Sequence, residues 1–430
     1  MRRFVLIAII CLALLSNVLA VTRANADARK IQTVDIKGAI VPVTADYVDR
    51  VIGVAEDSDA ICIILMDTPG GLGSAMQQIC QRIIAAEVPV IVYVVPGGWA
   101  ASAGTFIAMS AHVAAMAPNS SIGAATPISS EGEQLPEDVR AKAINFYESY
   151  MAALAAERDH NVEWAKQAVR DAVSATGTEA LDLNVIDVLA DDFDDLVGQL
   201  DGITITLAGG QDVTLDTDGY SLTHAPMNVV ERFLFAISDS NVAYILLGLA
   251  MLGIFIELSN PGTIFPGVIG GILLLLGLYS LSMLSAQWSG ILLIVLACVL
   301  FILEVFITSG GLLTAGGVTS LVIGSLVLFS GHPAIFRINP WLIGGVAGGI
   351  SIFFILVITA IIRAHGRQPV TGAEGLINET AIAKTVLNPV GTIFLHGENW
   401  NAISDGGKIE EGDEVVVTKV EGLKLRVKKT

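Results

Sequence analysis

The stretch PVIVYVVPGGWAASAGT, residues 89–105, decides the fold. Its apolar, β-branched first half is typical of a strand that is covered on both faces. A turn with two glycines ends this run, and Ser102 then begins a helix of small residues. A strand, a tight turn and a helix in this order indicate an α/β layered domain.

Similar apolar runs recur between Ile31 and about Ala190 and alternate with longer, helix-like segments. Four of them read VDIKGAIVPV, ICIILMD, HVAAMAP and NVIDVLA. This alternation predicts one α/β domain over residues 27–240. Turn glycines between about Ile203 and Leu222 predict a small β appendage that ends the domain.

The N-terminus has the features of an export signal. Two arginines at positions 2 and 3 precede an apolar run that reaches about Ala20, and the small residues ANA end at Ala26. These features predict a secretory signal peptide over residues 1–26, with an uncleaved membrane helix as the alternative. Either interpretation places the α/β domain outside the cytoplasm. Of the cysteines, Cys62 and Cys80 lie in this domain, and we expect two buried thiols, with a disulfide as the alternative.

The charge of the chain is concentrated in the exported domain. Residues 27–240 contain 31 acidic and 11 basic residues, so their net charge is −20, whereas the whole chain carries −18. Nucleic-acid binding needs a basic surface, which is missing here, so this class of function is excluded. The acidic residues are expected to form a solvated surface.

The composition also predicts a membrane domain. Of all residues, 53% are hydrophobic and only 15% are charged. The apolar part, residues 241–362, predicts about five membrane-spanning helices of some 20 residues each. Their expected ranges are 242–258, 264–284, 290–307, 311–330 and 342–362. An odd number of spans returns the chain to the cytoplasm, and the arginines of RAHGR at 363–367 agree with the positive-inside bias.

The membrane domain contains a weak internal repeat. FIELSNPGTIFPGVIGG (255–271) and FILEVFITSGGLLTAGG (301–317) each combine an acidic residue, a turn and a run of small residues. Glu257 and Glu304 need partners or water near the membrane boundary. We favour helix packing over a transport path, because a transport path more often has its charge in the middle of a span.

The last segment, residues 370–430, predicts about five short strands separated by Gly, Asn and Asp turns. This spacing suits a small closed β-barrel of the OB type. A basic stripe with interleaved aromatic residues is missing, since only Phe394 and Trp400 stand out, so we expect an assembly module.

Two stretches of the α/β domain predict a catalytic site. DTPGG, 67–71, follows a buried strand, and its glycines permit backbone N–H groups to form an oxyanion hole. Ser102 follows the next strand, where the start of a helix stabilises an alkoxide-like nucleophile. The alternative for Ser102 is a simple helix N-cap.

Together these stretches resemble those of ClpP-like serine peptidases and signal-peptide peptidase A relatives. DTPGG is similar to their oxyanion loop, GWAASAG to their nucleophile motif and MAPNSSIG to the strand that follows. The resemblance implies a ClpP/crotonase-like fold in which Ser102 attacks and the N–H groups of Gly71 and Ala103 hold the oxyanion. It makes Gly70 and Gly104 supporting residues of the two loops.

The sequence departs from the ClpP pattern at the residue that acts as the catalytic base. Ala125 stands where those proteases have the catalytic histidine, and the remaining exported histidines are expected to be surface or core residues. Those are His112, His160 and His224. A lysine can act as the base when burial lowers its pKa.

Between residues 97 and 165 the chain offers one lysine, Lys142, with small or apolar neighbours that suit a desolvated amine. Lys166 is the second choice, and a solvated helix lysine is the alternative for Lys142.

Over its whole length the chain resembles the long-form NfeD proteins, which are membrane-bound serine proteases of the ClpP class. GTIFLHGENWNA and IEEGDEVVVTKVEGLKLRV are similar to their OB domain, and NPGTIFPGVIGG to their membrane motif. The resemblance implies a Ser102–Lys142 dyad, cleavage of apolar segments, a stomatin (SPFH-type) membrane partner and a homodimer or higher oligomer. It implies no metal or cofactor. It also implies a bacterial cytoplasmic membrane, with the protease domain outside and the OB domain inside.

Two other classes of function stay open at this point. A membrane scaffold that organises a stomatin partner would need no working serine. A crotonase-type acyl-CoA enzyme would share the fold and the paired oxyanion donors, but CoA is cytosolic, so export argues against it.

Overall fold

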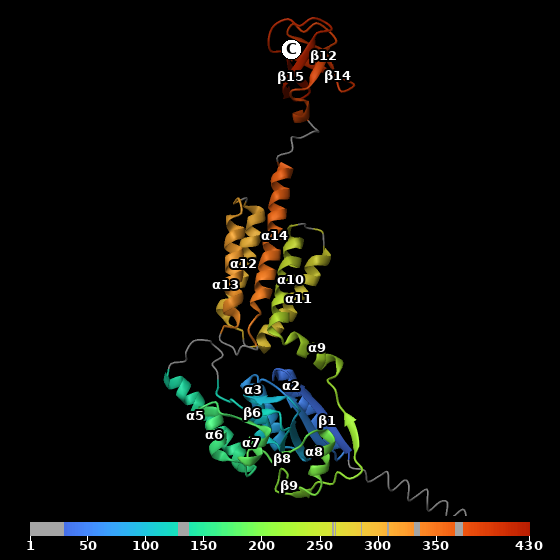
Figure 1. Cartoon of the computed structure of the whole chain (residues 1–430). Helices are drawn as coiled ribbons and strands as arrows, with labels where there is room; N and C mark the ends of the chain where they lie inside the picture. The colour runs from blue at the N-terminus through green and yellow to red at the C-terminus, as the bar shows by residue number, and fades with distance from the viewer. Residues whose placement is uncertain are drawn as a thin grey trace, which may run out of the picture. The chain divides into compact units, whose positions relative to one another are not determined.

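The computed structural model describes residues 30–127, 137–259, 262, 264–284, 286–307, 309–330, 336–365 and 373–430. The chain divides into two compact units, Met1–Ile350 and Ser351–Thr430, which are described separately. The first unit contains the α/β domain and most of the apolar helices (Figure 1). The predicted signal peptide, residues 1–26, lies outside the described residues and stays a prediction.

A six-stranded parallel sheet forms the centre of the α/β domain. Its strand order is β11-β1-β2-β3-β5-β8, and all five pairings are parallel. In chain order the strands are β1 (Lys30–Lys37), β2 (Ile61–Asp67), β3 (Val90–Val94), β5 (Val113–Met116), β8 (Val188–Leu189) and β11 (Ser221–His224). The sheet confirms the predicted layered α/β architecture.

Helices pack around the sheet (Figure 1), and seven of them lie within the described residues of this domain. They are α2 (Pro42–Asp57), α3 (Gly73–Ile84), α4 (Ala103–Ser110), α5 (Glu137–Glu157), α6 (Val162–Arg170), α7 (Gly177–Asp182) and α8 (Phe193–Leu200). Successive residues of β2 enter different cores. Cys62 packs in the core that includes α2 and α3, whereas Ile63 packs in the core that includes α8. Both faces of the strand are therefore covered, which explains its unbroken apolar sequence.

The two cysteines of the domain, Cys62 and Cys80, are buried free thiols, as expected. Two smaller sheets complete the domain. One contains β4 (Trp99–Ala101), β6 (Ser121–Gly123) and β7 (Ser174–Thr176), and the other is the hairpin of β9 (Thr204–Thr206) and β10 (Asp212–Thr214). The hairpin confirms the predicted β appendage, but its predicted end is wrong, because β11 leaves the hairpin and pairs with β1 in the main sheet.

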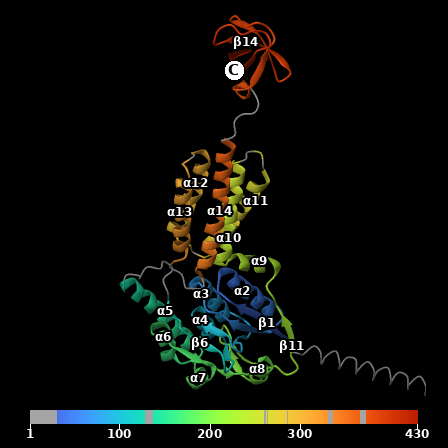
Figure 2. The ribbon, with the colours of Figure 1, turned by 45° about the horizontal axis from the view of Figure 1, so that its top comes forward.

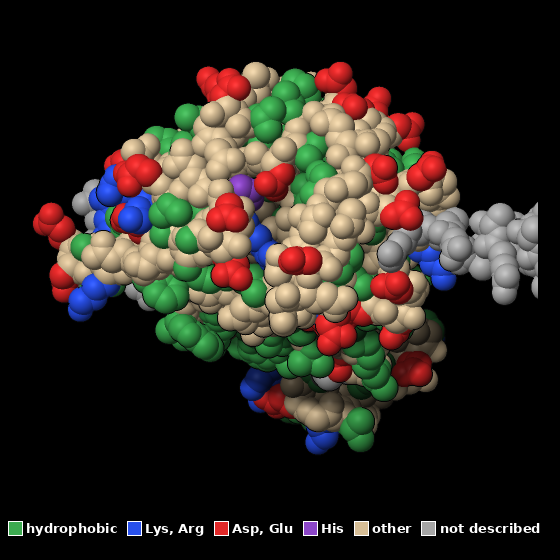
Figure 3. Space-filling model, turned by 90° about the horizontal axis from the view of Figure 1, so that it is seen from below, with side chains coloured by type: hydrophobic (Ala, Val, Ile, Leu, Met, Phe, Trp, Pro, Cys, Tyr) green, Lys and Arg blue, Asp and Glu red, His purple; other side chains and the backbone are tan. Residues whose placement is uncertain are grey.

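The surface of this domain is acidic, as its composition predicts. Figure 3 shows Asp and Glu side chains spread over the face of the domain seen there, with few Lys or Arg side chains among them. These acids are separated by polar and apolar patches instead of forming one cluster. They are consistent with a solvated surface.

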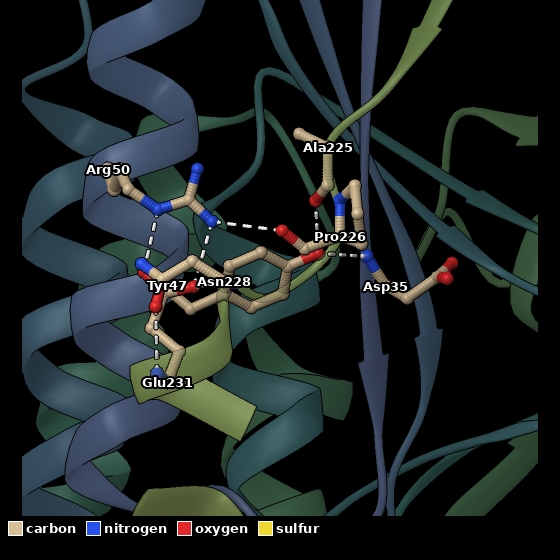
Figure 4. A network of polar contacts seen from close by, with 7 residues as sticks. All are labelled: Asp35, Tyr47, Arg50, Ala225, Pro226, Asn228 and Glu231. Carbon is tan, nitrogen blue, oxygen red and sulfur yellow. Dashed lines mark hydrogen bonds and ion pairs between the residues drawn. The ribbon is translucent and has the colours of Figure 1, made fainter. Parts of the chain in front are cut away.

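Helix α9 (Val229–Ile237) follows the α/β domain and is fixed to α2 by an ion pair (Figure 4). The Nε and Nη2 atoms of Arg50 donate to the two carboxylate oxygens of Glu231 over 2.6 and 2.8 Å. These hydrogen bonds lower the pKa of Glu231 and raise that of Arg50. The Asn228 side chain caps the helix by accepting the N–H of Glu231 over 2.9 Å.

Five apolar helices follow at the places that the hydropathy predicts. They are α10 (Ser240–Ser259), α11 (Ile264–Met283), α12 (Trp288–Phe306), α13 (Leu312–Leu328) and α14 (Pro340–His365). By length and composition, three of them are able to cross a membrane, namely α10, α11 and the part of α14 over Pro340–Val357. The apolar stretches of α12 and α13 are shorter. The number of five crossings therefore stays a prediction.

The internal repeat corresponds to two helical hairpins. In the second hairpin, the acidic residue Glu304 has a structural role. Glu304 is only 5% exposed. Its carboxylate accepts hydrogen bonds from the N–H groups of Gly311 and Thr314, over 3.1 and 2.9 Å, and from the Ser309 hydroxyl over 2.7 Å. The start of a helix leaves such N–H groups without an acceptor of their own, so Glu304 caps α13.

Glu257 has a similar position in the first hairpin. A side chain at Gly267, near the start of α11, would overlap the Glu257 carboxylate. Gly267 follows Glu257 by the same number of residues as Thr314 follows Glu304. The packing at both acids agrees with the structural interpretation of the repeat.

The second unit ends in a closed barrel with the strand order β12-β13-β14-β16-β15. Its strands are β12 (Thr380–Ala383), β13 (Val390–Leu395), β14 (Glu398–Ser404), β15 (Glu414–Glu421) and β16 (Lys424–Lys429), preceded by the short helix η2 (Ala373–Leu376). Alternate residues such as Val415, Val417, Leu425 and Val427 fill the interior. The prediction of about five strands in a closed barrel is confirmed.

Replacement of Glu304 by alanine is expected to destabilise the second hairpin by roughly 1–3 kcal/mol, because buried N–H groups then lose their acceptor. Glu304→Gln keeps one carbonyl oxygen and should fall between wild type and Glu304→Ala. Thermal unfolding of the full chain in detergent measures both effects. Equal stability of Glu304→Ala and wild type would contradict the capping role.

Candidate active site

The two predicted catalytic stretches lie side by side, because each follows one of two paired strands. Residues 68–72 connect β2 to α3, whereas β3 leads through β4 to Ser102 and α4. Strands β2 and β3 are hydrogen-bonded neighbours, so both connections emerge at the same edge of the sheet. The N–H of Thr68 donates to the Trp99 carbonyl over 2.7 Å, and the N–H of Ala101 donates to the Thr68 carbonyl over 3.1 Å. These bonds join the two loops directly.

Ser102 has an unusual backbone conformation, with φ 52° and ψ −114°. A positive φ is costly for a residue with a side chain and occurs where the surroundings enforce it. The N–H of Ser102 donates to the Gly123 carbonyl over 3.0 Å, and its carbonyl accepts the N–H of Thr105 over 3.0 Å. Ser102 occupies the N-cap position of α4, but its side chain makes no capping hydrogen bond. A capping role therefore does not explain why a residue with a hydroxyl group stands at position 102.

The buried hydroxyl of Thr105 holds this turn together. It lies 2.8 Å from the Ala100 carbonyl oxygen and 2.9 Å from the Gly123 carbonyl oxygen, and the Gly123 N–H donates to it over 3.2 Å. Strands β4 and β6 are thereby fixed on either side of the turn that carries Ser102.

The glycine loop packs directly against Ser102. Gly70 has φ 111°, and a Cβ atom placed on it would lie 2.6 Å from the Ser102 Cβ. Its own N–H donates to the Thr68 hydroxyl over 3.0 Å. A side chain on Gly71 would overlap the backbone of Ile40, and one on Gly104 would lie 2.6 Å from the Thr68 Cγ2. Glycine is therefore required at each position by close packing.

The loop is extended by strand-like pairing with the segment before α2. The Ile40 N–H donates to the Gly70 carbonyl over 2.9 Å, and the Leu72 N–H donates to the Ile40 carbonyl over 2.8 Å. Within the described residues, the N–H groups of Gly71 and Ala103 have no hydrogen-bond acceptor. For Ala103 this follows from its place at the start of α4. Both predicted oxyanion donors are therefore available.

Lys142 lies on the first part of α5, and its side chain is exposed. The prediction that its neighbours shield it from water is wrong for the single chain. The reason is that the buried side chains of α5 lie farther along the helix, at Met151, Leu154 and Ala155. The rings of Phe106 and Tyr147 also pack edge to face, with centroids 5.8 Å apart. In the described part of the chain no hydrogen bond joins Lys142 to Ser102. The second choice, Lys166 of α6, is partly buried and also has no such bond.

The three histidines all have positions away from Ser102, as expected. His112 follows the far end of α4, and its Nδ1 accepts the N–H of Val90 over 3.1 Å. The Nε2 of His160 lies 3.2 Å from the Asp187 carboxylate, and His224 lies at the end of β11. Ala125 is buried beside α6. Among the described residues, no three His, Cys, Asp or Glu side chains are grouped so that they could hold a metal ion.

Three family models match consecutive parts of the chain. They are the NfeD1b N-terminal domain at residues 30–196, the NfeD integral membrane domain at 241–360 and the NfeD-like C-terminal, partner-binding domain at 373–429. The membrane-bound protease PH1510 of Pyrococcus horikoshii is 36% identical, over 99% of this chain and 98% of its own length. The chain belongs to the long-form NfeD family of membrane proteases. It is thus a multi-pass membrane protein.

Other members are also similar to this NfeD chain. Membrane protein NfeD1b of Bacillus subtilis is 27% identical, over 94% of both chains. Among solved structures, the 1510-N membrane-bound stomatin-specific protease, with one lysine replaced by alanine and a substrate peptide bound, is 36% identical. It covers 49% of this chain and 98% of its own, with a TM-score of 0.46.

Three residues that support the site in this NfeD chain were not predicted from the sequence. Thr68 and Thr105 are fully buried, and their hydroxyls bond to backbone groups of both loops. Ile40 pairs with the glycine loop from a distant part of the sequence. Thr68 lies in DTPGG and Thr105 at the end of the stretch 89–105. A polar residue among small and apolar neighbours could therefore have indicated a structural role for both. Ile40 gave no such indication.

Thr105→Val is expected to destabilise the chain by about 1–3 kcal/mol, because it leaves buried carbonyl and N–H groups without a partner. Thr105→Ser keeps the hydroxyl and should stay closer to wild type. The midpoint of thermal unfolding in detergent compares the two variants. A midpoint of Thr105→Val at or above that of Thr105→Ser would contradict this role of the hydroxyl.

Burial lowers the pKa of His112 from 6.5 to about 4, with a smaller contribution from Arg158. The unfolded chain therefore binds a proton at a higher pH than the folded chain, so stability should fall as the pH drops from about 6.5 to about 4. His112→Gln keeps an acceptor for the Val90 N–H but does not titrate in this range. Unfolding midpoints measured across this range should fall less steeply for His112→Gln, and parallel curves would count against the effect.

Proposed function

We propose that the chain is a membrane-bound serine endopeptidase with Ser102 as nucleophile and Lys142 as general base. The observation that carries this proposal is the Ser102 turn, where a half-buried hydroxyl without a capping bond lies against a glycine loop. The Gly71 and Ala103 N–H groups are the proposed oxyanion donors. Membership of a family that includes a membrane-bound protease supports the same reaction.

In the proposed reaction, the neutral amine of Lys142 takes the hydroxyl proton as Ser102 Oγ bonds to the peptide carbonyl carbon. The tetrahedral intermediate carries its negative charge on the oxygen held by Gly71 and Ala103. It collapses with cleavage of the C–N bond, and Lys142 passes its proton to the leaving amine. Water then attacks the acyl-enzyme by the same route and frees Ser102.

The exposed position of Lys142 has a consequence for the substrate. Val139 and Phe146 lie three residues before and four residues after Lys142, so the three share one helix face, and the two apolar side chains are 41% and 57% exposed. A substrate with an apolar segment can cover this face and remove Lys142 from water. Desolvation favours the neutral amine that the reaction needs. This supports apolar segments of membrane-associated proteins as the substrate class.

We also propose a ClpP/crotonase-like class for the α/β domain and an OB-type fold for the barrel. The parallel sheet with two adjacent strand–loop–helix units supports the first, and the closed five-stranded topology supports the second. The description of the matching C-terminal family model as partner-binding supports a partner at the barrel, for which a stomatin-type membrane protein is the candidate. A homodimer or higher oligomer is proposed from the family resemblance.

The proposed orientation places the α/β domain outside the cytoplasm and the barrel inside, in a bacterial cytoplasmic membrane. Its support is the signal-like N-terminus, an odd number of predicted spans and the basic residues Arg363 and Arg367 that follow the last predicted span.

Ser102→Ala is expected to abolish cleavage of a fluorogenic peptide with an apolar segment, and also labelling by a fluorophosphonate. Lys142→Ala should reduce turnover by about 10²–10⁴-fold, the usual contribution of a general base. Lys166→Ala is the matched control and should remain near wild type.

These assays use the full chain in detergent or nanodiscs. Undiminished cleavage by Ser102→Ala or by Lys142→Ala would overturn the proposed dyad. A wild-type chain that neither cleaves nor reacts with the fluorophosphonate would favour the membrane scaffold instead.

A further inference from the structure

Helix α9 presents an apolar stripe that the described residues of the chain leave uncovered. Val229 is 86% exposed, Val230 65% and Phe233 49%. Val229, Phe233 and the exposed Ala236 follow one another at helical spacing, so they share one face, with Arg232 beside it. These side chains form one contiguous stripe along a helix of nine residues, whereas ordinary exposed hydrophobic residues are scattered singly over a protein surface.

The opposite face of α9 is firmly held. Glu231 is paired with Arg50, while Leu234 and Phe235 pack into a buried cluster that includes Val41 and Tyr244. The helix therefore cannot easily turn its exposed stripe inward. Among the described residues, none covers the stripe.

The place of α9 in the chain indicates what covers it. Only two residues separate its end at Ile237 from the start of α10 at Ser240, and Figures 1 and 2 both show it beside that end of α10. The Ser280 hydroxyl of α11 also donates to the Ile237 carbonyl, which ties α9 to the end of that helix. The stripe is therefore held at the level where the apolar helices begin.

Two tryptophans mark the same end of the helices. Trp288 begins α12 and is 77% exposed, and Trp341, at the start of α14, is 90% exposed. Exposed tryptophans at helix ends are typical of the boundary between lipid and water, where an aromatic ring reaches both environments. The two tryptophans place this boundary at the ends of the apolar helices near α9, and this evidence is independent of the sequence of α9.

We propose that α9 is an interfacial helix that lies in the headgroup region of the bilayer, with the stripe of Val229, Phe233 and Ala236 toward the acyl chains. Arg232 then lies beside lipid phosphates, as a basic residue flanking such a stripe does. The ion pair between Glu231 and Arg50 connects this lipid-bound helix to α2, so the α/β domain is fixed to the membrane surface. This inference does not depend on the proposed reaction.

The test uses the full chain in nanodiscs with the environment-sensitive fluorophore NBD on a single introduced cysteine. Phe233→Cys reports on the stripe, and Val54→Cys is the matched control, since Val54 is 43% exposed on the distal half of α2. The unmodified chain, labelled in parallel, gives the background from the native thiols. Val229→Cys is a second stripe variant in case Phe233→Cys does not fold.

With lipids that carry a doxyl quencher near the headgroup, fluorescence at position 233 or 229 is expected to be lost, whereas fluorescence at position 54 stays unchanged. The proposal would be overturned if the fluorophore on the stripe had the same emission wavelength and the same extent of quenching as the fluorophore at position 54. That result would show that water covers the stripe. Blue-shifted emission that lipid quenchers leave intact would show coverage by a protein or a second copy, and would overturn it as well.

Discussion

The strained backbone at Ser102 is the constraint on which the site depends. A residue with a side chain avoids φ 52° and ψ −114°, at a cost of roughly 1–3 kcal/mol, unless its neighbours enforce it. Here the Gly123 carbonyl, the Thr105 hydroxyl and the close packing of Gly70 enforce it together. The conformation turns the serine hydroxyl away from its usual capping role, and a group freed in this way can act as a nucleophile.

The same site is supported from the membrane side of the domain. The glycine loop pairs with Ile40, and the next residue, Val41, packs in one buried cluster with Tyr244 and Leu281 of the apolar helices. A short segment before α2 therefore makes both the backbone pairing with the glycine loop and the packing against the membrane domain.

Much of the architecture was predictable from local sequence patterns. Unbroken apolar runs indicated strands covered on both faces, and hydropathy placed five apolar helices within a few residues of their observed ends. The glycines of DTPGG and the small residues after Ser102 also indicated the two loops, since only glycine permits the close approaches seen at Gly70 and Gly71. The environment of Lys142 was predicted wrongly, because apolar neighbours in sequence do not shield a side chain that no described residue covers.

The sequence by itself determined which residues are strands, helices and glycine turns, because burial periodicity and backbone freedom are properties of short segments. Only the tertiary structure decided that Ile40 would support the loop at Gly71, that Thr105 would bind the carbonyl of Gly123 and that Arg50 would hold Glu231. Each of these contacts joins residues that are far apart in the chain or on different elements. Their pairing is set by how the sheet and helices pack, which no local pattern encodes.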